Sequence, residues 1–123
     1  MLSLQNIRYA LGQSNVKYSG KLNRKISPMI KSIDSFAKNN DVFVKILDKK
    51  DSVYVQVDKS ITKHVADIPS YAMKNQTGDS VYIPIRESAG KSLQMKDLDT
   101  HNFWITLKNL RNQVNESLNK IAN

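Results

Sequence analysis

Residues 42–58 read VFVKILDKKDSVYVQVD, and this stretch decides the fold class. Apolar residues occupy every second position of residues 42–47 and again of residues 53–58, which is the period of a β-strand with one buried face. The charged residues 48–51 lie between these two runs and suit a turn of roughly four residues. We therefore predict an antiparallel β-hairpin.

The predicted hairpin has two chemically different faces. Its aliphatic face comprises Val42, Val44, Ile46, Val53, Val55 and Val57. On the other face, a turn at residues 48–51 sets Lys45 opposite Tyr54 and Phe43 opposite Gln56. Aromatic and cationic side chains are therefore expected to interleave on one side of the sheet.

A further strand is predicted at residues 80–86. It adds Val81, Ile83 and Ile85 to the aliphatic face and Tyr82 and Arg86 to the other face. Pro84 cannot donate a ladder hydrogen bond, so this strand should lie at an edge of the sheet or pair irregularly. Residues 88–90 are expected to turn the chain before a short strand at residues 92–95. Residues 61–73 fit either a strand or a turn of helix.

Helical patterns flank the predicted sheet. Apolar residues recur at intervals of three and four over residues 23–39, where Ser27 is the expected N-cap. A long last helix is predicted over residues 100–121, with Trp104 fixing it to the sheet. The buried stripe of that helix would be Phe103, Leu107, Leu110, Val114, Leu118 and Ile121. Residues 13–20 are predicted to be a loop.

The order of these elements predicts an α+β fold. We expect an N-terminal helical segment, an antiparallel β-meander of about four strands, and a long C-terminal helix packed on one sheet face. The chain of 123 residues suits a single domain, 1–123, and is long enough to bury a hydrophobic core. Residues 1–22 are expected to form a basic arm that is flexible or partly helical.

The composition excludes several classes of site. The chain has no cysteine, which rules out disulfides, thiolate metal sites, iron–sulfur clusters and a thiol nucleophile. His64 and His101 are far apart and lack neighbouring carboxylate clusters, so no metal or other cofactor is expected. Polar residues interrupt residues 1–10, and no apolar run is long enough to span a membrane. We expect a soluble, cytoplasmic protein.

The charge is strongly positive and unevenly distributed. The formal net charge is +8, and residues 1–40 hold seven lysines and arginines against one acid, a net charge of +6. Such an excess attracts polyanions. The cations of this segment that we expect to contact phosphates are Lys17, Lys21, Arg24, Lys25 and Lys31.

The basic segment and the aromatic face together predict a non-catalytic protein that binds nucleic acid, preferentially single strands. Aromatic rings stack on bases and cations neutralise phosphates. On the sheet, the predicted contacts are Phe43, Lys45, Tyr54, Tyr82 and Arg86. The competing interpretation is that these aromatic residues are present only because they favour strands.

The C-terminal part of the chain resembles the positive-cofactor and Whirly type of single-stranded-DNA-binding fold. The likeness rests on residues 83–87 (IPIRE), residues 90–93 (GKSL), and a following helix that carries Trp104, Leu107, Lys108, Val114 and Ile121. It covers roughly the last two-thirds of the chain. The resemblance implies a four-stranded sheet followed by a helix, dimers, and single-strand binding across the sheets.

Two other functions fit the sequence. The first is a small protein-interaction module, such as an inhibitor or adaptor of a phage or mobile element, that docks on an acidic protein surface. The second is a small ribonuclease that uses His64 or His101, although no cluster of residues selects this activity. The protein would be a monomer or a homodimer, and a dimer could form through the last helix.

Overall fold

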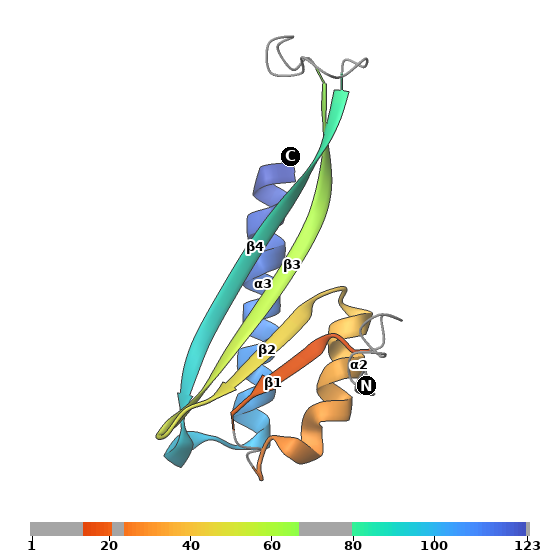
Figure 1. The fold of residues 1–123 in the computed structure, drawn as a ribbon. Helices are drawn as coiled ribbons and strands as arrows, with labels where there is room; N and C mark the ends of the chain where they lie inside the picture. The colour runs from red at the N-terminus through yellow and green to blue at the C-terminus, as the bar shows by residue number, and fades with distance from the viewer. Residues whose placement is uncertain (1–13, 21–23, 67–79, 123) are drawn as a thin grey trace.

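The structure, a computed structural model, describes residues 14–20, 24–66 and 80–122. The elements in chain order are β1 (Val16–Ser19), the 3-10 turn η1 (Ser27–Met29), α2 (Ile30–Asn39), β2 (Phe43–Asp48), β3 (Ser52–Ala66), β4 (Ser80–Gln94), the 3-10 turn η3 (Met95–Asp97) and α3 (Thr100–Ala122). Helices α2 and α3 lie on one side of a sheet of four strands (Figure 1). The predicted α+β class, with the last helix packed on one sheet face, is confirmed.

The sheet is mixed rather than wholly antiparallel. Its order is β1-β2-β3-β4, and β1 pairs with β2 in parallel while the other pairs are antiparallel. Two sequence predictions were therefore wrong, because residues 16–19 are a strand instead of loop and the sheet is not a simple meander. Strand β1 is too short for a period of two to be recognised in the sequence.

Asn15 fixes the start of β1 in its parallel position. Its backbone N–H donates to Asp34 Oδ1 of α2 at 2.7 Å, and its side-chain Nδ2 donates to the Val42 carbonyl at 3.1 Å. The Asn15 carbonyl in turn accepts from the Val44 N–H at 2.8 Å. The connection from β1 through α2 to β2 is thus held at both its beginning and its end.

The hairpin of β2 and β3 is confirmed, but its register differs from the prediction by two residues. Phe43 pairs with Asp58 and Lys45 with Gln56. The turn spans residues 49–52 instead of 48–51, since the Lys49 N–H donates to the Ser52 carbonyl at 2.9 Å. A shift of two residues leaves every side chain on its predicted face.

Strands β3 and β4 form a long hairpin of 15 residues on each side. The predicted turn at residues 88–90 and the separate strand at 92–95 were wrong, because β4 runs without interruption to Gln94. Residues 61–66 belong to β3, and residues 67–73 lie outside the described residues. Strand β4 is an edge of the sheet, as Pro84 predicted.

Gly90 is required within β4 because the Tyr54 side chain lies across it. A Cβ atom at Gly90 would overlap the hydroxyl and ring of Tyr54, the nearest atoms to that position. The glycine therefore marks a close approach of an aromatic ring to the backbone, and not a turn.

Replacing Gly90 with alanine tests this arrangement, because the change in the free energy of unfolding should be opposite in sign with and without the Tyr54 ring. In the wild-type background the change should lower the free energy of unfolding by about 1–2 kcal/mol, because the new methyl group displaces the Tyr54 ring. In a Tyr54→Ala background the same change should stabilise the protein, because glycine weakens a strand interior. Urea unfolding of the four proteins gives both values, and equal effects in the two backgrounds would contradict the packing described.

The core lies between the helices and the sheet. It includes Val44, Ile46, Val53, Val55 and Val57 from the sheet and Phe103, Leu107, Leu110, Val114 and Leu118 from α3, all of them buried. The predicted stripe of α3 is confirmed except at its last member, because Ile121 is 39% exposed.

The N-terminal end of α2 differs from the prediction. Ser27 is not an N-cap: it is the first residue of η1, and Ile26 precedes it without a side-chain cap. Pro28 fits the 3-10 turn because its missing N–H is not needed there.

Trp104 packs against the core between the helices and the sheet and also contacts α2. Its ring meets the Phe36 ring of α2 edge to face, with 5.7 Å between centroids. Arg111 of α3 lies 5.4 Å from the centroid of the same Phe36 ring and donates to Asn40 Oδ1 at 3.0 Å. These contacts hold α2 beside α3. Both helices lie on the same side of the sheet, so neither covers its opposite face (Figure 1).

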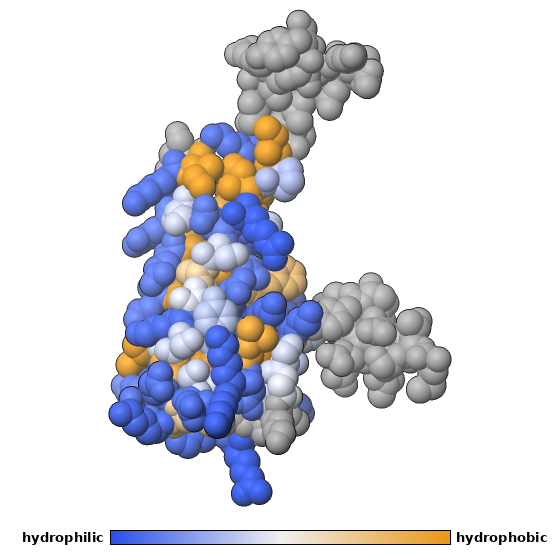
Figure 2. Space-filling model, turned by 60° about the vertical axis from the view of Figure 1, so that its left-hand side comes forward, coloured by the Kyte–Doolittle hydropathy of each residue, from blue (hydrophilic) through white to orange (hydrophobic). Residues whose placement is uncertain are grey.

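The described helices and one side of the surface were compared with what a membrane-spanning segment requires. Among the described residues, none of the helices combines the length and the apolar character needed to cross a bilayer. Seen from the side on which β4 lies, the surface is mainly hydrophilic, and hydrophobic side chains gather near the far end of the β3–β4 hairpin (Figure 2).

Candidate functional site

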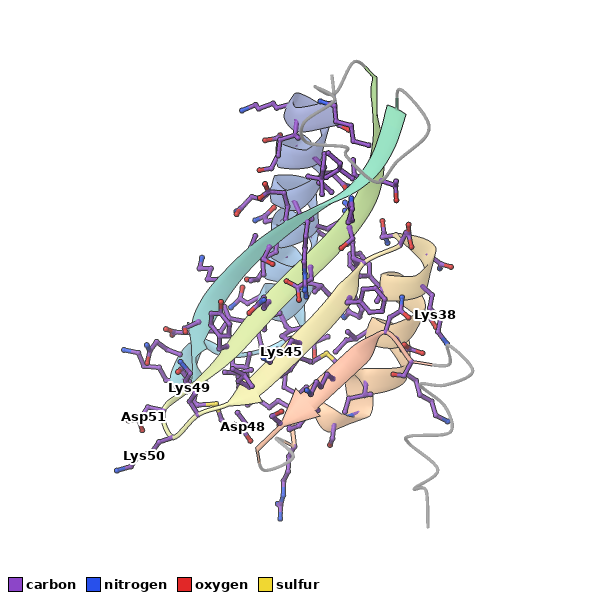
Figure 3. The ribbon with its side chains drawn as sticks, turned by 45° about the horizontal axis from the view of Figure 1, so that its top comes forward. Lys38, Lys45, Asp48, Lys49, Lys50 and Asp51 are labelled. Atoms are coloured by element: carbon purple, nitrogen blue, oxygen red, sulfur yellow. The ribbon has the colours of Figure 1, made fainter. Side chains whose placement is uncertain are left out.

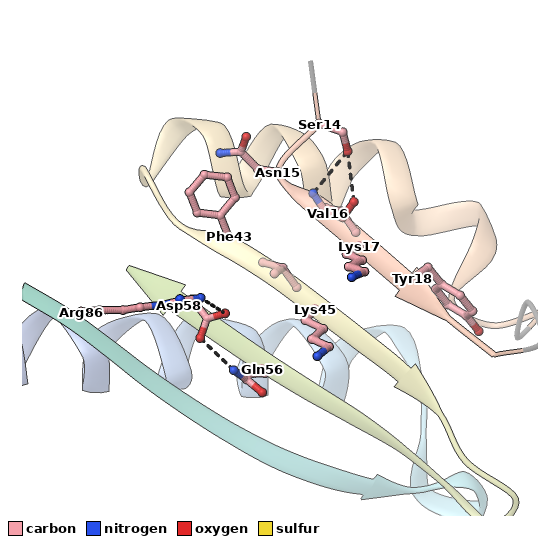
Figure 4. Close-up of a pocket in the computed structure, with 11 residues that line it drawn as sticks. Ser14, Asn15, Val16, Lys17, Tyr18, Phe43, Lys45, Gln56, Asp58 and Arg86 are labelled. Carbon is pink, nitrogen blue, oxygen red and sulfur yellow. Dashed lines mark hydrogen bonds and ion pairs between the residues drawn. The ribbon is translucent and has the colours of Figure 1, made fainter. Parts of the chain in front are cut away.

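The face of the sheet opposite α2 and α3, which we term the open face, contains a shallow depression of about 650 Å³. Figure 4 shows it lying across strands β1, β2 and β3, with Arg86 reaching in from β4. Its lining consists of Ser14, Asn15, Val16, Lys17, Tyr18, Phe43, Val44, Lys45, Gln56, Asp58 and Arg86. The depression therefore combines an aromatic ring, amides, a carboxylate and cations.

The strand register explains why these side chains meet. Lys17 of β1 is the Cα partner of Lys45, and Lys45 is the partner of Gln56 on β3. In the next row, Phe43 is the partner of Asp58. Side chains of paired residues point to the same face, so two short rows of polar and aromatic groups lie side by side.

Phe43 is the most exposed large apolar side chain of the site. Phe43 is 55% exposed, although phenylalanine side chains are most often buried in folded proteins. The neighbouring residue Val44 is buried, and both residues are paired with β3. Phe43 is therefore exposed because it lies on the open face of a regular strand. An aromatic ring is thus presented to solvent at the rim of the depression (Figure 4).

Asp58 is the best-anchored polar group of the site. The residue is only 8% exposed. Its carboxylate accepts hydrogen bonds from the Ser88 hydroxyl, from Gln56 Nε2 at 2.8 Å and from Arg86 Nη2 at 3.5 Å. The Arg86 side chain is itself 70% exposed, so one end of this ion pair faces solvent.

The environment of Asp58 lowers its pKa below the ordinary value. Burial alone would raise the pKa of this carboxyl, but the hydrogen bonds from Ser88 and Gln56 and the charge of Arg86 together outweigh burial. A carboxyl with a depressed folded-state pKa stabilises the fold above its unfolded pKa, and that contribution is lost as the pH falls through the folded pKa.

An Asp58→Asn variant is expected to show this dependence. Above about pH 5 it should be less stable than the wild type by roughly 1–3 kcal/mol, because the donors around residue 58 lose their anionic acceptor. As the pH falls through the lowered pKa of Asp58 the difference should shrink, since the wild-type carboxyl then becomes neutral, as the amide of the variant already is. Thermal or urea unfolding at several pH values measures it, and a difference that does not change with pH would show that Asp58 is not held as its contacts indicate.

Tyr54 lies on the open face but outside the lining of the depression. Its ring covers Gly90, and Lys49 Nζ lies 5.2 Å from the ring centroid. Lys49, Lys50 and Asp51 project from the nearby β2–β3 turn, while Lys45 rises from the middle of β2 (Figure 3). Tyr54 thus extends the aromatic and cationic surface from the depression toward the turn.

The structure brings together part of the predicted set of nucleic-acid contacts. Lys17, Phe43, Lys45 and Arg86 all line the depression. Arg24, Lys25 and Lys31 do not line it; Lys25 Nζ donates to the Leu98 carbonyl at 2.7 Å, and Lys31 is an exposed residue of α2. Among the described cations of the basic segment, Lys17 thus lies on β1 at the depression, whereas Lys31 lies on α2 in the helical layer.

Two predicted contacts cannot be placed. Lys21 lies outside the described residues, and Tyr82 belongs to β4 by its backbone while its side chain is not described.

Sequence reasoning missed four polar members of the site: Ser14, Asn15, Gln56 as a lining residue, and Asp58. Ser14 and Asn15 were hidden because β1 was not recognised. The alternation of Tyr54, Gln56 and Asp58 with three valines was a usable signal, since it places all three on one face. That Asp58 would be buried there depends on Ser88 and Arg86, which the two-stranded pattern does not reveal.

The charged groups that line the depression are mostly cations. Among the described residues, no three His, Asp or Glu side chains gather where they could hold a metal ion. Lys17, Lys45 and Arg86 line the depression together with one carboxylate, that of Asp58, so the charged side chains of the lining carry a net positive charge. No protein-family model, curated protein or solved structure matches this chain significantly.

Proposed function

We propose that the protein binds single-stranded nucleic acid on the open face of its sheet, without catalysis. One observation carries the proposal: the exposed Phe43 ring lines the same depression as the paired lysines Lys17 and Lys45. A single strand offers unpaired base faces for the ring and phosphates for the lysines. A duplex hides its base faces and would use only the charges, so single strands are the preferred ligand.

The adjacent lysines support this proposal. Lys17 and Lys45 are direct partners on neighbouring strands, and like charges so placed repel each other. A local conflict of this kind is typical of a functional surface, because a bound anion removes the repulsion. A phosphate between the two lysines would do so.

The polar floor of the depression supports recognition of base edges. Gln56 and Asn15 carry amide groups, and Asp58 is a fixed hydrogen-bond acceptor beside Arg86. Amide and carboxylate groups can bond the edges of unpaired bases. We place the protein in the cytoplasm, because a chain without cysteine suits a reducing compartment. The resemblance to the positive-cofactor and Whirly type points to the same class of ligand.

A salt titration with Phe43 variants tests the proposal. Wild-type protein should bind single-stranded DNA or RNA oligonucleotides more tightly than duplex DNA, with an affinity that falls as salt rises. Phe43→Ala should weaken single-strand binding by roughly 5–150-fold, the value of one stacked base. Phe43→Tyr keeps an aromatic ring and is the matched control, expected to bind within about threefold of the wild type.

The outcome also separates the alternatives. Undetectable binding to every oligonucleotide at low salt would refute the proposal and favour a protein-interaction module. Cleavage of RNA that is lost in a His101→Ala or His64→Ala variant would instead favour a ribonuclease.

A further inference from the structure

The outer edge of β4 is a long, regular strand edge. β4 has 15 residues and is the last strand of the sheet, and within the described part of the chain it pairs only with β3. A strand edge of this length presents backbone donors and acceptors that another strand can use. The edge is therefore a candidate interaction surface.

The direction of the backbone groups along β4 follows from one hydrogen bond. The Met95 N–H donates to the Asp51 carbonyl at 2.9 Å, in line with the β3–β4 register. Because these directions alternate along an antiparallel strand, odd-numbered residues of β4 face β3 and even-numbered residues face outward. Pro84 falls on an outward position, so it costs the β3 ladder nothing, and from Arg86 to Gln94 every outward position carries an N–H group.

The sequence on this edge is complementary to itself in the antiparallel direction. With Ala89 opposite its own counterpart, Glu87 lies opposite Lys91 of the partner subunit, and the reverse pair also forms. Ile85 then lies opposite Leu93 of the partner subunit. In this register the outward-facing residues form the hydrogen bonds between the two strands: Arg86 pairs with Ser92 of the partner subunit, and Ser88 pairs with Gly90 of the partner subunit.

We infer that two copies of this chain pair along their β4 edges, antiparallel and centred on Ala89. Neighbouring registers are less suitable: centring on Glu87 sets two glutamates against each other, and centring on Ser88 or Gly90 leaves Glu87 opposite an apolar residue. Neither Glu87 nor Lys91 forms an ion pair within the described residues. In the proposed register each gains an ion pair across the edge.

The pairing would join two four-stranded sheets into one continuous sheet. A two-fold axis perpendicular to the sheet relates antiparallel edge strands, so both helical layers stay on the same side. The open faces of the two copies would then adjoin each other. The interface differs from a dimer formed through α3, whose apolar stripe is buried against its own sheet.

A charge exchange tests the proposed register, with protein alone and no nucleic acid. Sedimentation equilibrium should show a dimer of the wild type at concentrations on the order of 100 µM. Lys91→Glu should weaken the dimer by about 10–100-fold, because both ion pairs become repulsive. The double variant E87K/K91E should restore dimerisation. Lys108→Glu, the same charge change on exposed α3, is the control.

A cysteine variant gives an independent test. Ala89→Cys introduces the sole cysteine of the chain, and in this register its Cα lies about 4.5 Å from its counterpart, within disulfide range. Mild oxidation should cross-link this variant, whereas Ser88→Cys, which lies opposite Gly90 of the partner subunit, should not. A monomeric wild type, a double variant as weak as Lys91→Glu, or equal cross-linking of both cysteines would overturn the inference. Because no nucleic acid is present, these results are independent of the proposed binding function.

Discussion

A variant in which Lys17 and Lys45 are both replaced by glutamate is expected to bind single-stranded oligonucleotides weaker by a factor on the order of several hundred at about 0.1 M salt. Losing two phosphate contacts makes the slope of log affinity against log salt concentration shallower by about 1.4. At about 0.1 M salt, this corresponds to an affinity about 25-fold lower. Reversing the charges adds repulsion of the phosphates, which increases the loss further. Fluorescence anisotropy over a range of salt concentrations measures both the affinity and its slope.

The double replacement is suited to this test because we expect it to leave the fold intact. Lys17 and Lys45 already repel each other as paired residues, and two glutamates in the same places repel to a similar extent. The matched control is Lys31→Glu with Lys108→Glu, which makes the same change in net charge on exposed positions of α2 and α3. Equal losses in both double variants would show that binding depends on net charge and not on the open face.

The second large effect is expected on stability, from Phe103→Ala. Phe103 is fully buried in the core, on the side of α3 that faces the sheet. Removing its ring leaves a cavity among residues that cannot all collapse into it, which should lower the free energy of unfolding by about 3–5 kcal/mol. Such a loss is a large fraction of the stability of a domain of this size.

Ile105→Ala is the control for this prediction. Ile105 lies two positions further along α3 and is 44% exposed, so its truncation should change the free energy of unfolding by less than about 0.5 kcal/mol. Urea unfolding of both variants gives the comparison. A small effect at Phe103, similar to that at Ile105, would contradict the packing of α3 on the sheet.

The sequence predicts those parts of the fold whose patterns are long. The alternation on either side of the β2–β3 turn and the stripe of α3 each involve several apolar residues, so the hairpin and the last helix were predicted correctly. Strand β1 has only the residues Val16–Ser19, and its parallel pairing depends on Asn15 bonding to Asp34 and Val42. Contacts of this kind between distant residues leave no periodic signal in the sequence.

The errors in the hairpins have local causes. At the β2–β3 turn, the charged residues 48–51 suggested the loop, but Asp48 stays in the strand, where its carboxylate accepts from the Tyr18 hydroxyl at 3.2 Å. In β4, Ser88-Ala89-Gly90 has the composition of a turn. The structure instead uses Ser88 to bond Asp58 and Gly90 to accommodate the Tyr54 ring.

The site was predicted only where it depends on alternation within a strand. Phe43 and Lys45 were assigned to the correct face, because a register shift of two residues does not change faces. Arg86 was assigned to the same face by the alternation of residues 80–86, and it pairs there with Ser60 of β3. The cations of the basic segment were predicted as phosphate contacts together, and the structure places Lys17 on the sheet and Lys31 in the helical layer. Net charge indicates that a polyanion is attracted, but only the fold determines which cations act together.

The central claim is that the open face is the binding surface, and amide chemical shifts measured by NMR test it most directly. A single-stranded oligonucleotide is titrated into isotope-labelled protein at low salt. The account predicts that the largest changes fall on residues 15–17, 43–45, 56 and 86, which line the depression. Changes confined to exposed positions of α2 and α3, or no changes at any residue, would contradict it.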